Sequence, residues 1–504
     1  MNKAKFTEQI IELIRRTSAF LPQDVEQVLS LKKKLETPGS KADFALDLVM
    51  QNIGLAKRNS LPICQDTGLL TFYVKCPVGF DQIVLQAAME DAVAQATAKG
   101  YLRQNSVDSL TGKNSGTNLG PGSPTFKFVQ TYDKNIDIRL IQKGGGCENM
   151  SAQYKLPGEF NGKKFGRDLE GVRACVLDAV YQAQGKGCSP GFLGVCIGGD
   201  RASGYEWAKY QLLREVDDTN PVPELAALES RIMEEANELA IGPMGFGGKM
   251  TIGCCKIGLR NRLPASFFVT IAYMCWAYRR RGFVLNQEGE VVEWLYQPMD
   301  EFDKPLDLPE TFKIPAGEIK TLTTPLSEQD IRSLKVGDIV ILNGTIFTGR
   351  DAVHKYLYEG GELEPIKNGI IYHCGPVILK QDGEYKTMAA GPTTSIREEP
   401  YQGEIIEKFG IKAVIGKGGM GAKTLKACQN YGAVYLHAIG GAAQIYAQCV
   451  KKIPNVYLEQ FGSPEAVWEM KVEGFPAVVT MDSHGNSLHK EVQEISLNKL
   501  KQLL

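Results

Sequence analysis

The sequence predicts a multidomain α/β protein. We expect a helix-rich α+β N-terminal domain over residues 1–285, a linker over 286–325, and a smaller layered β/α domain of the swivelling type over 326–504. The chain of 504 residues is long enough for two to four domains of roughly 100 to 200 residues each. Its first half alternates helical patterns with glycine-rich segments, whereas its last third carries short β-branched runs between helical segments.

The first half begins with an amphipathic helix, because Phe6, Ile10, Leu13 and Ile14 share one face between charged residues. The same spacing predicts helices over 83–98 and 224–241. The longest apolar run, Leu263 to Tyr278, has 16 residues, fewer than the roughly 20 that cross a bilayer, so it predicts a buried strand or core helix. No apolar signal segment follows the first lysines, and we expect a soluble cytoplasmic protein.

The linker is predicted from proline, which cannot continue a helix. The prolines concerned are Pro298, Pro305, Pro309, Pro315 and Pro325. Beyond them, β-branched apolar runs predict strands at 336–342, 369–372, 413–415, 433–436 and 477–480. Helical patterns at 401–409 and 442–450 lie between these strands, as a β/α domain requires.

The composition excludes several classes of protein. Lysine and arginine number 57 against 58 aspartates and glutamates, so the net charge of −1 favours neither nucleic acid nor a membrane surface as partner. Hydrophobic residues at 43% and charged residues at 23% are typical of globular domains. Glycine (53) and cysteine (12) stand out, yet the cysteines are too sparse for a disulfide scaffold. They favour a reducing compartment with free thiols or a thiolate-bound metal centre.

Three glycine clusters are candidate ligand sites, since backbone without side chains can contact a ligand directly. Gly416 to Thr424 (GKGGMGAKT) lies between a strand and a helix, but Ala422 breaks the spacing of a nucleotide-binding P-loop. It fits a carboxylate or phosphate cradle beside Lys417 or, alternatively, a plain turn. The clusters at 143–149 (KGGGCEN) and 242–249 (GPMGFGGK) favour function over tight turns.

Two cysteines lie in polar turn sequence, Cys64 in ICQDTG and Cys188 in GKGCSPG, and both are candidate metal ligands. No local signal selects a third from Cys147, Cys254, Cys255 and Cys275. Two arginine-bearing segments, TGRDAVH at 348–354 and GPTTSIRE at 391–398, suit bidentate capture of a carboxylate, with surface ion pairing as the equal alternative.

Taken together, eight motifs in order resemble the class I, iron–sulfur dependent fumarate hydratases in their single-chain form. They are ICQDTG (63–68), KGGG (143–146), the Cys188 loop, GPMGFGGK (242–249), YMCWAYRR (273–280), GRDAVH (349–354), GPTT with Arg397 (391–397) and GKG (416–418). The resemblance covers nearly the whole chain.

The resemblance implies a 4Fe-4S cluster held by Cys64, Cys188 and Cys275, with one iron open to substrate. It assigns proton transfer to Thr393 with the help of Asp66. It assigns the binding of a small dicarboxylate to Gln65, Arg103, Gly145, Arg350, Arg397 and Lys417. The site is expected between the two domains of each chain, and closure of the smaller domain would gate it. A homodimer and the reversible hydration of fumarate to L-malate follow from the same resemblance.

The chain departs from the family pattern at two places. Cys147 stands where many members have serine, and the segment RNRLPAS at 260–266 has no histidine where some members carry one, which leaves Arg262 as a substitute. The alternatives are an L(+)-tartrate dehydratase or mesaconate hydratase, an iron–sulfur redox or sensor protein, and a nucleotide-binding module using Gly416 to Thr424.

Overall fold

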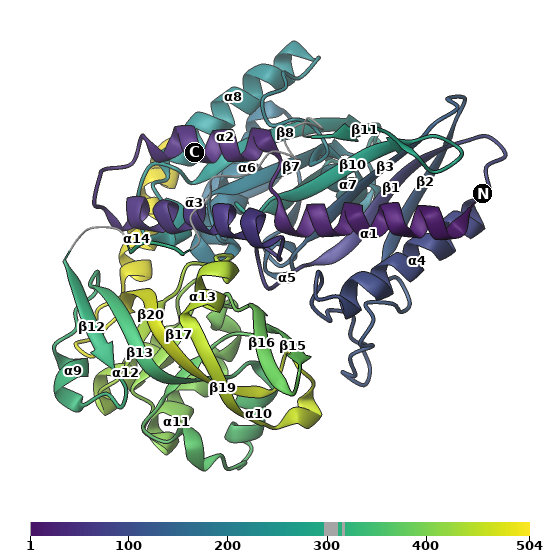
Figure 1. Cartoon of the computed structure of the whole chain (residues 1–504). Coiled ribbons are helices and arrows are strands. Elements are labelled where there is room, and N and C mark those ends of the chain that lie inside the picture. Colours follow the sequence, from purple (N-terminus) through teal and green to yellow (C-terminus); the bar gives the residue numbers. More distant parts are fainter. Residues whose placement is uncertain (1, 297–310, 315–317) are drawn as a thin grey trace.

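The computed structural model describes residues 2–296, 311–314 and 318–504, and it shows a mixed α/β protein (Figure 1). The helix-rich region and two sheets come from the first part of the chain, and a barrel-like sheet comes from the last part. Among the described helices, none combines the length and the apolar character needed to cross a membrane.

The first sheet has five strands in the order β11-β10-β3-β1-β2. They are β1 (Leu69–Pro77), β2 (Thr125–Thr131), β3 (Ile136–Lys143), β10 (Arg279–Leu285) and β11 (Val291–Leu295). Helices α1 (Lys3–Ala19) and α4 (Gln82–Ala98) share a core with this sheet, in which Phe6 and Ile10 are buried together with Phe72 and Leu140. The predicted first helix and the helix at 83–98 are therefore confirmed.

The second sheet has four strands in the order β4-β9-β7-β8. They are β4 (Ala152–Lys155), β7 (Gly191–Gly198), β8 (Ile252–Arg260) and β9 (Phe268–Met274). The apolar run 263–278 thus contains a buried strand, because β9 pairs with both β4 and β7, although Leu263 itself is exposed. Helices α6 (Leu169–Ala183) and α8 (Pro223–Glu238) complete its core. The other elements of this half are α2 (Gln23–Lys33), α3 (Lys41–Asn59), α5 (Gly145–Glu148), α7 (Arg201–Gln211), and the hairpin β5 (Gly158–Phe160) and β6 (Lys163–Phe165).

The last part of the chain forms a seven-stranded sheet in the order β12-β13-β14-β17-β18-β20-β19. Its strands are β12 (Ile319–Thr323), β13 (Ile339–Thr348), β14 (Ile370–Tyr372), β17 (Ala413–Gly416), β18 (Val434–His437), β19 (Val450–Tyr457) and β20 (Val467–Met481). Strand β20 pairs with both β13 and β18, so five of these strands close into a barrel-like ring. All five strands predicted from β-branched runs lie in this sheet.

The helices of this part are α9 (Glu328–Arg332), α10 (Asp351–Tyr358), α11 (Glu399–Phe409), α12 (Ala422–Tyr431), α13 (Ala443–Cys449) and α14 (Leu488–Leu503), with a hairpin of β15 (Val377–Gln381) and β16 (Glu384–Ala389). Two of them contact the first half, α13 against α3 and α14 against α6. At the first contact the Asn52 Oδ1 accepts the Gln444 amide at 2.8 Å. The two halves therefore share an extensive packed boundary.

The stretch predicted as a linker, 286–325, contains two strands. Strand β11 pairs with β10 in the first sheet, and β12 pairs with β13 in the last. Pro298, Pro305, Pro309 and Pro315 lie outside the described residues. The connection between the sheets is thus shorter than the proline pattern indicates, while the domain boundaries and the swivelling-type description stay predictions.

Candidate functional site

The ICQDTG loop connects α3 to β1 and carries Asp66, whose carboxylate is surrounded by hydrogen-bond donors. The Asp66 carboxylate accepts the Gly145 amide at 2.9 Å and the Gly68 amide at 3.2 Å, and Arg103 Nη2 lies 3.4 Å from it. The loop itself is pinned because Asn52 Nδ2 donates to the Ile63 carbonyl at 2.9 Å. Three segments distant in sequence are thereby held around one carboxylate.

The electrostatics keep Asp66 ionised. Burial alone would raise the pKa of Asp66, but Arg103, Arg279 and Lys417, together with the Gly145 amide, outweigh burial and lower the pKa to about 2. Asp66 is therefore a carboxylate at neutral pH.

Gln65 and Arg103 join this loop to the second half of the chain. The Gln65 Nε2 donates to the Pro392 carbonyl at 2.9 Å, and Arg103 Nη1 donates to the Gly375 carbonyl at 2.9 Å. A Cβ atom at Gly391 would collide with Gln65 Oε1, so glycine is required there for this close approach. The structure thus brings the predicted residues of both halves to one boundary.

Thr393 lies just beyond that contact, and its side chain is half-buried. Its amide donates to the His373 carbonyl at 2.7 Å, its carbonyl accepts the Lys417 amide at 3.2 Å, and its Oγ1 accepts from Arg397 Nη2 at 3.3 Å. Arg397 also pairs with Asp351 at 3.0 Å. The backbone therefore fixes Thr393, and one arginine contacts its hydroxyl.

Arg350 approaches the same region at Gly375, where a Cβ atom would lie 2.6 Å from the Arg350 Nη1. That nitrogen is 3.1 Å from Glu465 Oε1 and donates to the Pro464 carbonyl at 3.2 Å. Arg103 and Arg350 thus meet at one glycine, and Arg350 also carries its own carboxylate partner.

The three predicted metal ligands lie in one buried group although they come from three distant segments. Cys64, Cys188 and Cys275 are 6%, 3% and 6% exposed. Each influences the others electrostatically, and Lys417 Nζ donates to Cys188 Sγ at 2.8 Å. Cys147 joins this group, since its thiol is hydrogen-bonded to that of Cys275.

The donor set fits an iron–sulfur cluster better than a single ion. No three of the four sulfurs lie within 4.8 Å of one another, so the thiols do not converge on one metal. Burial raises the pKa of the Cys188 thiol to about 11, so a bound cation is needed to hold it as thiolate. A Cβ atom at Gly440 would collide with Cys188 Sγ, so glycine keeps this sulfur accessible. Buried, soft, mutually separated thiols are the ligands that a multi-iron cluster takes.

Comparison with known proteins agrees with this geometry. Residues 7–284 match the family described as fumarate hydratase (Fumerase), and residues 289–492 match the fumarase C-terminus. A Geobacillus stearothermophilus protein, provisionally named class I fumarate hydratase, is 54% identical over 505 residues, which cover 99% of this chain and 98% of that protein. The chain belongs to the class I fumarate hydratase family. This is a family of hydro-lyases, and class I membership implies an iron–sulfur centre.

Tartrate dehydratases are more distant relatives of this class I family member. A provisionally named L(+)-tartrate dehydratase subunit beta of Methanocaldococcus jannaschii is 45% identical, over 36% of this chain and 95% of the subunit. The corresponding subunit alpha is 33% identical, over 55% of this chain and 96% of the subunit.

In two of the three glycine clusters, backbone amides donate to glutamate side chains of this hydratase-family chain itself. The amides of Gly421 and Lys423 donate to the Glu399 carboxylate at 2.7 and 2.9 Å, so the cradle at 416–424 holds the chain's own carboxylate. The amides of Lys249 and Met250 donate to Glu36 at 2.9 and 2.8 Å. An internal glutamate thus occupies the donors at the end of the 242–249 cluster, whose expected functional role stays a prediction. A nucleotide at 416–424 is disfavoured because Glu399 already accepts the amides there. The cluster at 143–146 contacts Asp66.

Sequence reasoning missed a buried polar network behind Thr393. The Gln402 side chain contacts His354 Nε2 and His373 Nε2, both at 2.9 Å. His354 Nδ1 donates to the Arg350 carbonyl at 2.9 Å, and His373 Nδ1 lies 2.7 Å from Ser395 Oγ. Burial lowers the pKa of both histidines, so they stay neutral. Isolated histidines in separate segments carry no spacing signal that would have grouped them.

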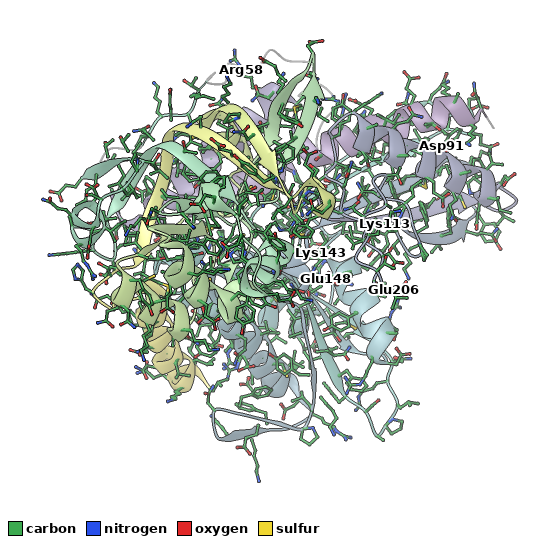
Figure 2. The ribbon with its side chains drawn as sticks, turned by 90° about the horizontal axis from the view of Figure 1, so that it is seen from below. Arg58, Asp91, Lys113, Lys143, Glu148 and Glu206 are labelled. Carbon is green, nitrogen blue, oxygen red and sulfur yellow. The ribbon has the colours of Figure 1, made fainter. Side chains whose placement is uncertain are left out.

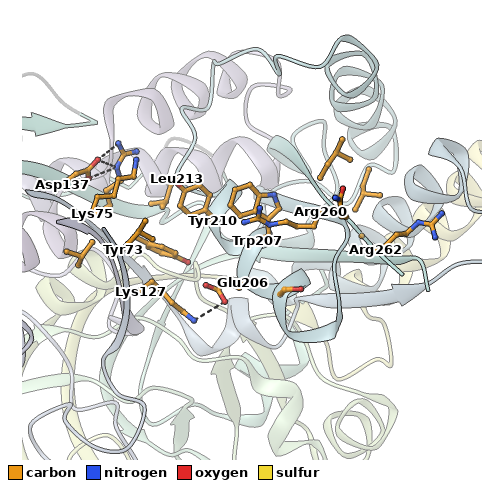
Figure 3. Close-up of a pocket in the computed structure, with 18 of the residues that line it drawn as sticks. Tyr73, Lys75, Lys127, Asp137, Glu206, Trp207, Tyr210, Leu213, Arg260 and Arg262 are labelled. Atoms are coloured by element: carbon orange, nitrogen blue, oxygen red, sulfur yellow. Dashed lines mark hydrogen bonds and ion pairs between the residues drawn. The ribbon is translucent and has the colours of Figure 1, made fainter. Parts of the chain in front are cut away.

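Two hollows lie near the N-terminal side of the site. A cavity of about 270 Å³ is lined by Asp66 and Gly145 and by Lys143, whose ammonium lies 2.6 Å from Glu148 (Figure 2). A larger groove of about 1440 Å³ is lined by stacked Trp207 and Tyr210 (Figure 3). Tyr73 borders both hollows. Arg262 lies on the large groove and donates to carbonyls of its own loop, so within one chain it does not join Asp66.

Proposed function

We propose that this chain catalyses the reversible hydration of fumarate to L-malate at a 4Fe-4S cluster held by Cys64, Cys188 and Cys275. One observation supports the proposal most strongly: Gln65, Arg103 and Cys188 of the first half are hydrogen-bonded to Pro392, Gly375 and Lys417 of the second. These contacts bring together the segments that carry the proposed ligands and the proposed substrate contacts. When bound, the cluster supplies a Lewis acid for the hydroxyl and carboxylate of the substrate.

The protein groups supply the proton transfer. Dehydration of malate removes a weakly acidic C–H proton next to a carboxylate and expels the hydroxyl from the adjacent carbon, for which the Lewis acid named above would be the acceptor. We assign the proton to Thr393 Oγ1 in its deprotonated form. Arg397, 3.3 Å from this oxygen, stabilises it when it is deprotonated. Asp66, ionised beside the Gly145 amide, contributes a negative charge that raises the basicity of Thr393.

The cations bind and orient the dicarboxylate. Arg103 and Arg350 meet at Gly375, where a planar guanidinium fork suits a carboxylate. Gln65, Gly145 and Arg397 complete the proposed substrate contacts. Lys417 has a second role, because its ammonium already lies 2.8 Å from Cys188 Sγ and compensates thiolate charge. Gating by movement of the second half, a homodimer and a cytoplasmic location belong to the same proposal.

Anaerobic reconstitution followed by turnover of fumarate, L-tartrate and mesaconate tests the proposal. We expect iron and sulfide to bind and fumarate to be the fastest substrate. Faster turnover of L-tartrate would favour the alternative function, L(+)-tartrate dehydratase, which is the activity that the names of the related Methanocaldococcus jannaschii subunits state. Protein that binds iron and sulfide but turns over none of the three acids would overturn the hydro-lyase proposal in favour of a redox or sensor role.

A further inference from the structure

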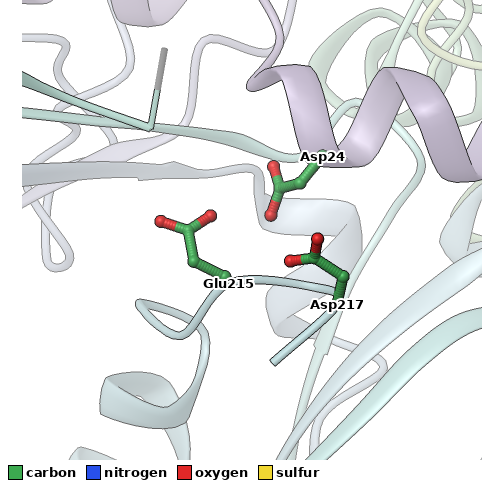
Figure 4. Close-up of side chains that lie close together, drawn as sticks. All are labelled: Asp24, Glu215 and Asp217. Atoms are coloured by element: carbon green, nitrogen blue, oxygen red, sulfur yellow. The ribbon is translucent and has the colours of Figure 1, made fainter. Parts of the chain in front are cut away.

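Strand β10 carries three consecutive buried arginines, and they differ in their partners. Arg280 pairs with Asp24 at 2.5 Å, within the acidic group of Asp24, Glu215 and Asp217 (Figure 4). Arg281 Nη2 donates to the Leu21 carbonyl at 2.6 Å. The side chain of Arg279, a residue that is 1% exposed, forms no hydrogen bond or ion pair with any residue that the structure describes, and its Nε and Nη1 are fully enclosed. It acts on the Asp66 carboxylate only from a distance. An unpaired buried guanidinium is costly and requires a compensating group.

The residue paired with Arg279 on the neighbouring strand also has a buried polar side chain without a hydrogen-bond partner in the described part of the chain. Gln142 of β3 is paired with Arg279 in register, and opposed residues of an antiparallel pair point to the same face. Gln142 is 0% exposed, and neither its amide oxygen nor its amide nitrogen has a partner in the described part of the chain. Two neighbouring side chains thus offer unused donors in one enclosed place, which indicates a polar occupant.

The strand ends show where this pair lies. Strand β1 begins directly after the Cys64–Gly68 loop, β3 ends directly before Gly144, and β10 begins four residues after Cys275. All three strands meet at this end of the first sheet, where Leu70, Gln142 and Arg279 form one row. The pair therefore lies on the cysteine side of the site.

We propose that Arg279, supported by Gln142, is the positioning cation of the cysteine side, which would balance the negative charge of the Cys64 thiolate and of the cluster that Cys64 would help to hold. This inference rests on the proposed cluster. It gives Arg279 a role different from that of Arg103 and Arg350, which we assign to the substrate. Hydrogen bonds to cluster sulfurs and nearby charges influence both the reduction potential of a cluster and how tightly the protein holds it.

The test compares Arg279→Gln and Arg279→Lys with Arg281→Gln in the reconstituted full-length protein. Arg281→Gln is the matched control, because Arg281 is a buried arginine of the same strand that donates to the Phe20 and Leu21 carbonyls. The readouts are iron and sulfide per chain, the rate of cluster loss to a chelator, the midpoint potential of the cluster, and KM for fumarate.

We expect Arg279→Gln to lose its cluster about 10- to 100-fold faster than wild type. Its midpoint potential should fall, because removal of a positive charge favours the oxidised cluster, and KM should stay close to the wild-type value. Arg279→Lys, which keeps the charge, should be intermediate and also tests the inference if the glutamine variant does not fold. Cluster loss no faster than in Arg281→Gln, or a raised KM with normal retention, would overturn the inference. Wild-type protein that binds no iron and sulfide would instead overturn the proposed function.

Discussion

The two halves of the chain contribute different surfaces to the same site. The first half supplies the thiols of Cys64, Cys188 and Cys275, all at most 6% exposed, on segments held by sheet ends and internal hydrogen bonds. The second half supplies Thr393, which is half-buried, and Arg397, whose side chain is 36% exposed. Lys417 and Arg350 are more enclosed: Lys417 extends from the second half to Cys188, and the Arg350 side chain is 13% exposed.

This difference indicates a division of labour. A cluster must be shielded from solvent and oxidants, so its ligands belong on the enclosed side. The substrate must enter and leave, so the proposed proton-transfer group Thr393 and the cation Arg397 belong on the more open side, while Arg103 of the first half is an enclosed substrate contact. Variants on the two sides should therefore separate the loss of cofactor from the loss of chemistry.

The largest effect is expected for Cys188→Ser. This change removes a proposed iron ligand, so bound iron and sulfide should fall with the complete loss of fumarate turnover. Iron and sulfide analysis together with an anaerobic assay measures both. Cys449→Ser is the control, because Cys449 is a buried thiol that contacts the Gly474 carbonyl instead of the other cysteines. Full cluster loading of Cys188→Ser would refute the ligand assignment.

Thr393→Ala should lower the turnover of fumarate without changing how much cluster the protein binds. Loss of a general acid–base group costs about 10²- to 10⁴-fold in kcat, while iron and sulfide content should stay at the wild-type level. Thr393→Ser keeps a hydroxyl within reach of Arg397 and should retain more activity. If Thr393→Ala loses its iron as well as its activity, the two sides are not separable in this way.

The same contrast shows which parts could be predicted from the sequence. Local periodicity located α4 at 82–98 and β17 at 413–416 because their patterns are set by neighbouring residues. Cys64 and Cys188 had a local signal in their turn residues. Cys275 did not, because it follows a buried strand, and only the family resemblance selected it.

The roles of the glycine loops and of some buried polar residues depend on tertiary contacts, which the local sequence does not show. Gly416–Thr424 and Gly242–Lys249 have the glycine content of ligand loops, but amides near the end of each loop donate to Glu399 and to Glu36, respectively. Nothing in either loop identifies those glutamates. The orphaned pair Arg279 and Gln142 likewise becomes visible only through strand register.

Glu398→Gln tests the protonation state of a buried carboxyl group, that of Glu398 next to Arg397 in the sequence. Glu398 is 0% exposed with no hydrogen-bond partner for its carboxyl oxygens among the described residues, and burial followed by repulsion from Asp351 raises its pKa to about 8. Arg397 and Arg350 oppose this shift incompletely. The folded chain should therefore keep a proton that the unfolded chain, with the ordinary pKa of 4.5, has released.

The sign follows from proton linkage. The wild-type free energy of unfolding should fall as pH rises from about 4.5 to 8, by up to a few kcal/mol, and this contribution should level off above pH 8. Glu398→Gln removes this titration, so the variant should show a shallower slope in denaturant unfolding measured across that window under anaerobic conditions. Equal slopes for the two proteins would show that Glu398 is ionised in the folded chain.

The smallest effect is expected for Glu399→Gln, which tests the contrast between the two kinds of glycine loop. The Glu399 carboxylate accepts the Gly421 and Lys423 amides and the Thr424 hydroxyl, which lies 2.7 Å away. A glutamine offers one acceptor oxygen in place of two, so the free energy of unfolding should fall by about 1 to 3 kcal/mol. Glu404→Gln on the same helix α11 is exposed and should change it by less than about 0.5 kcal/mol. Added phosphate or ATP should not restore stability, because the amides are fitted to an internal side chain; restoration by either anion would show that the loop is a ligand cradle after all.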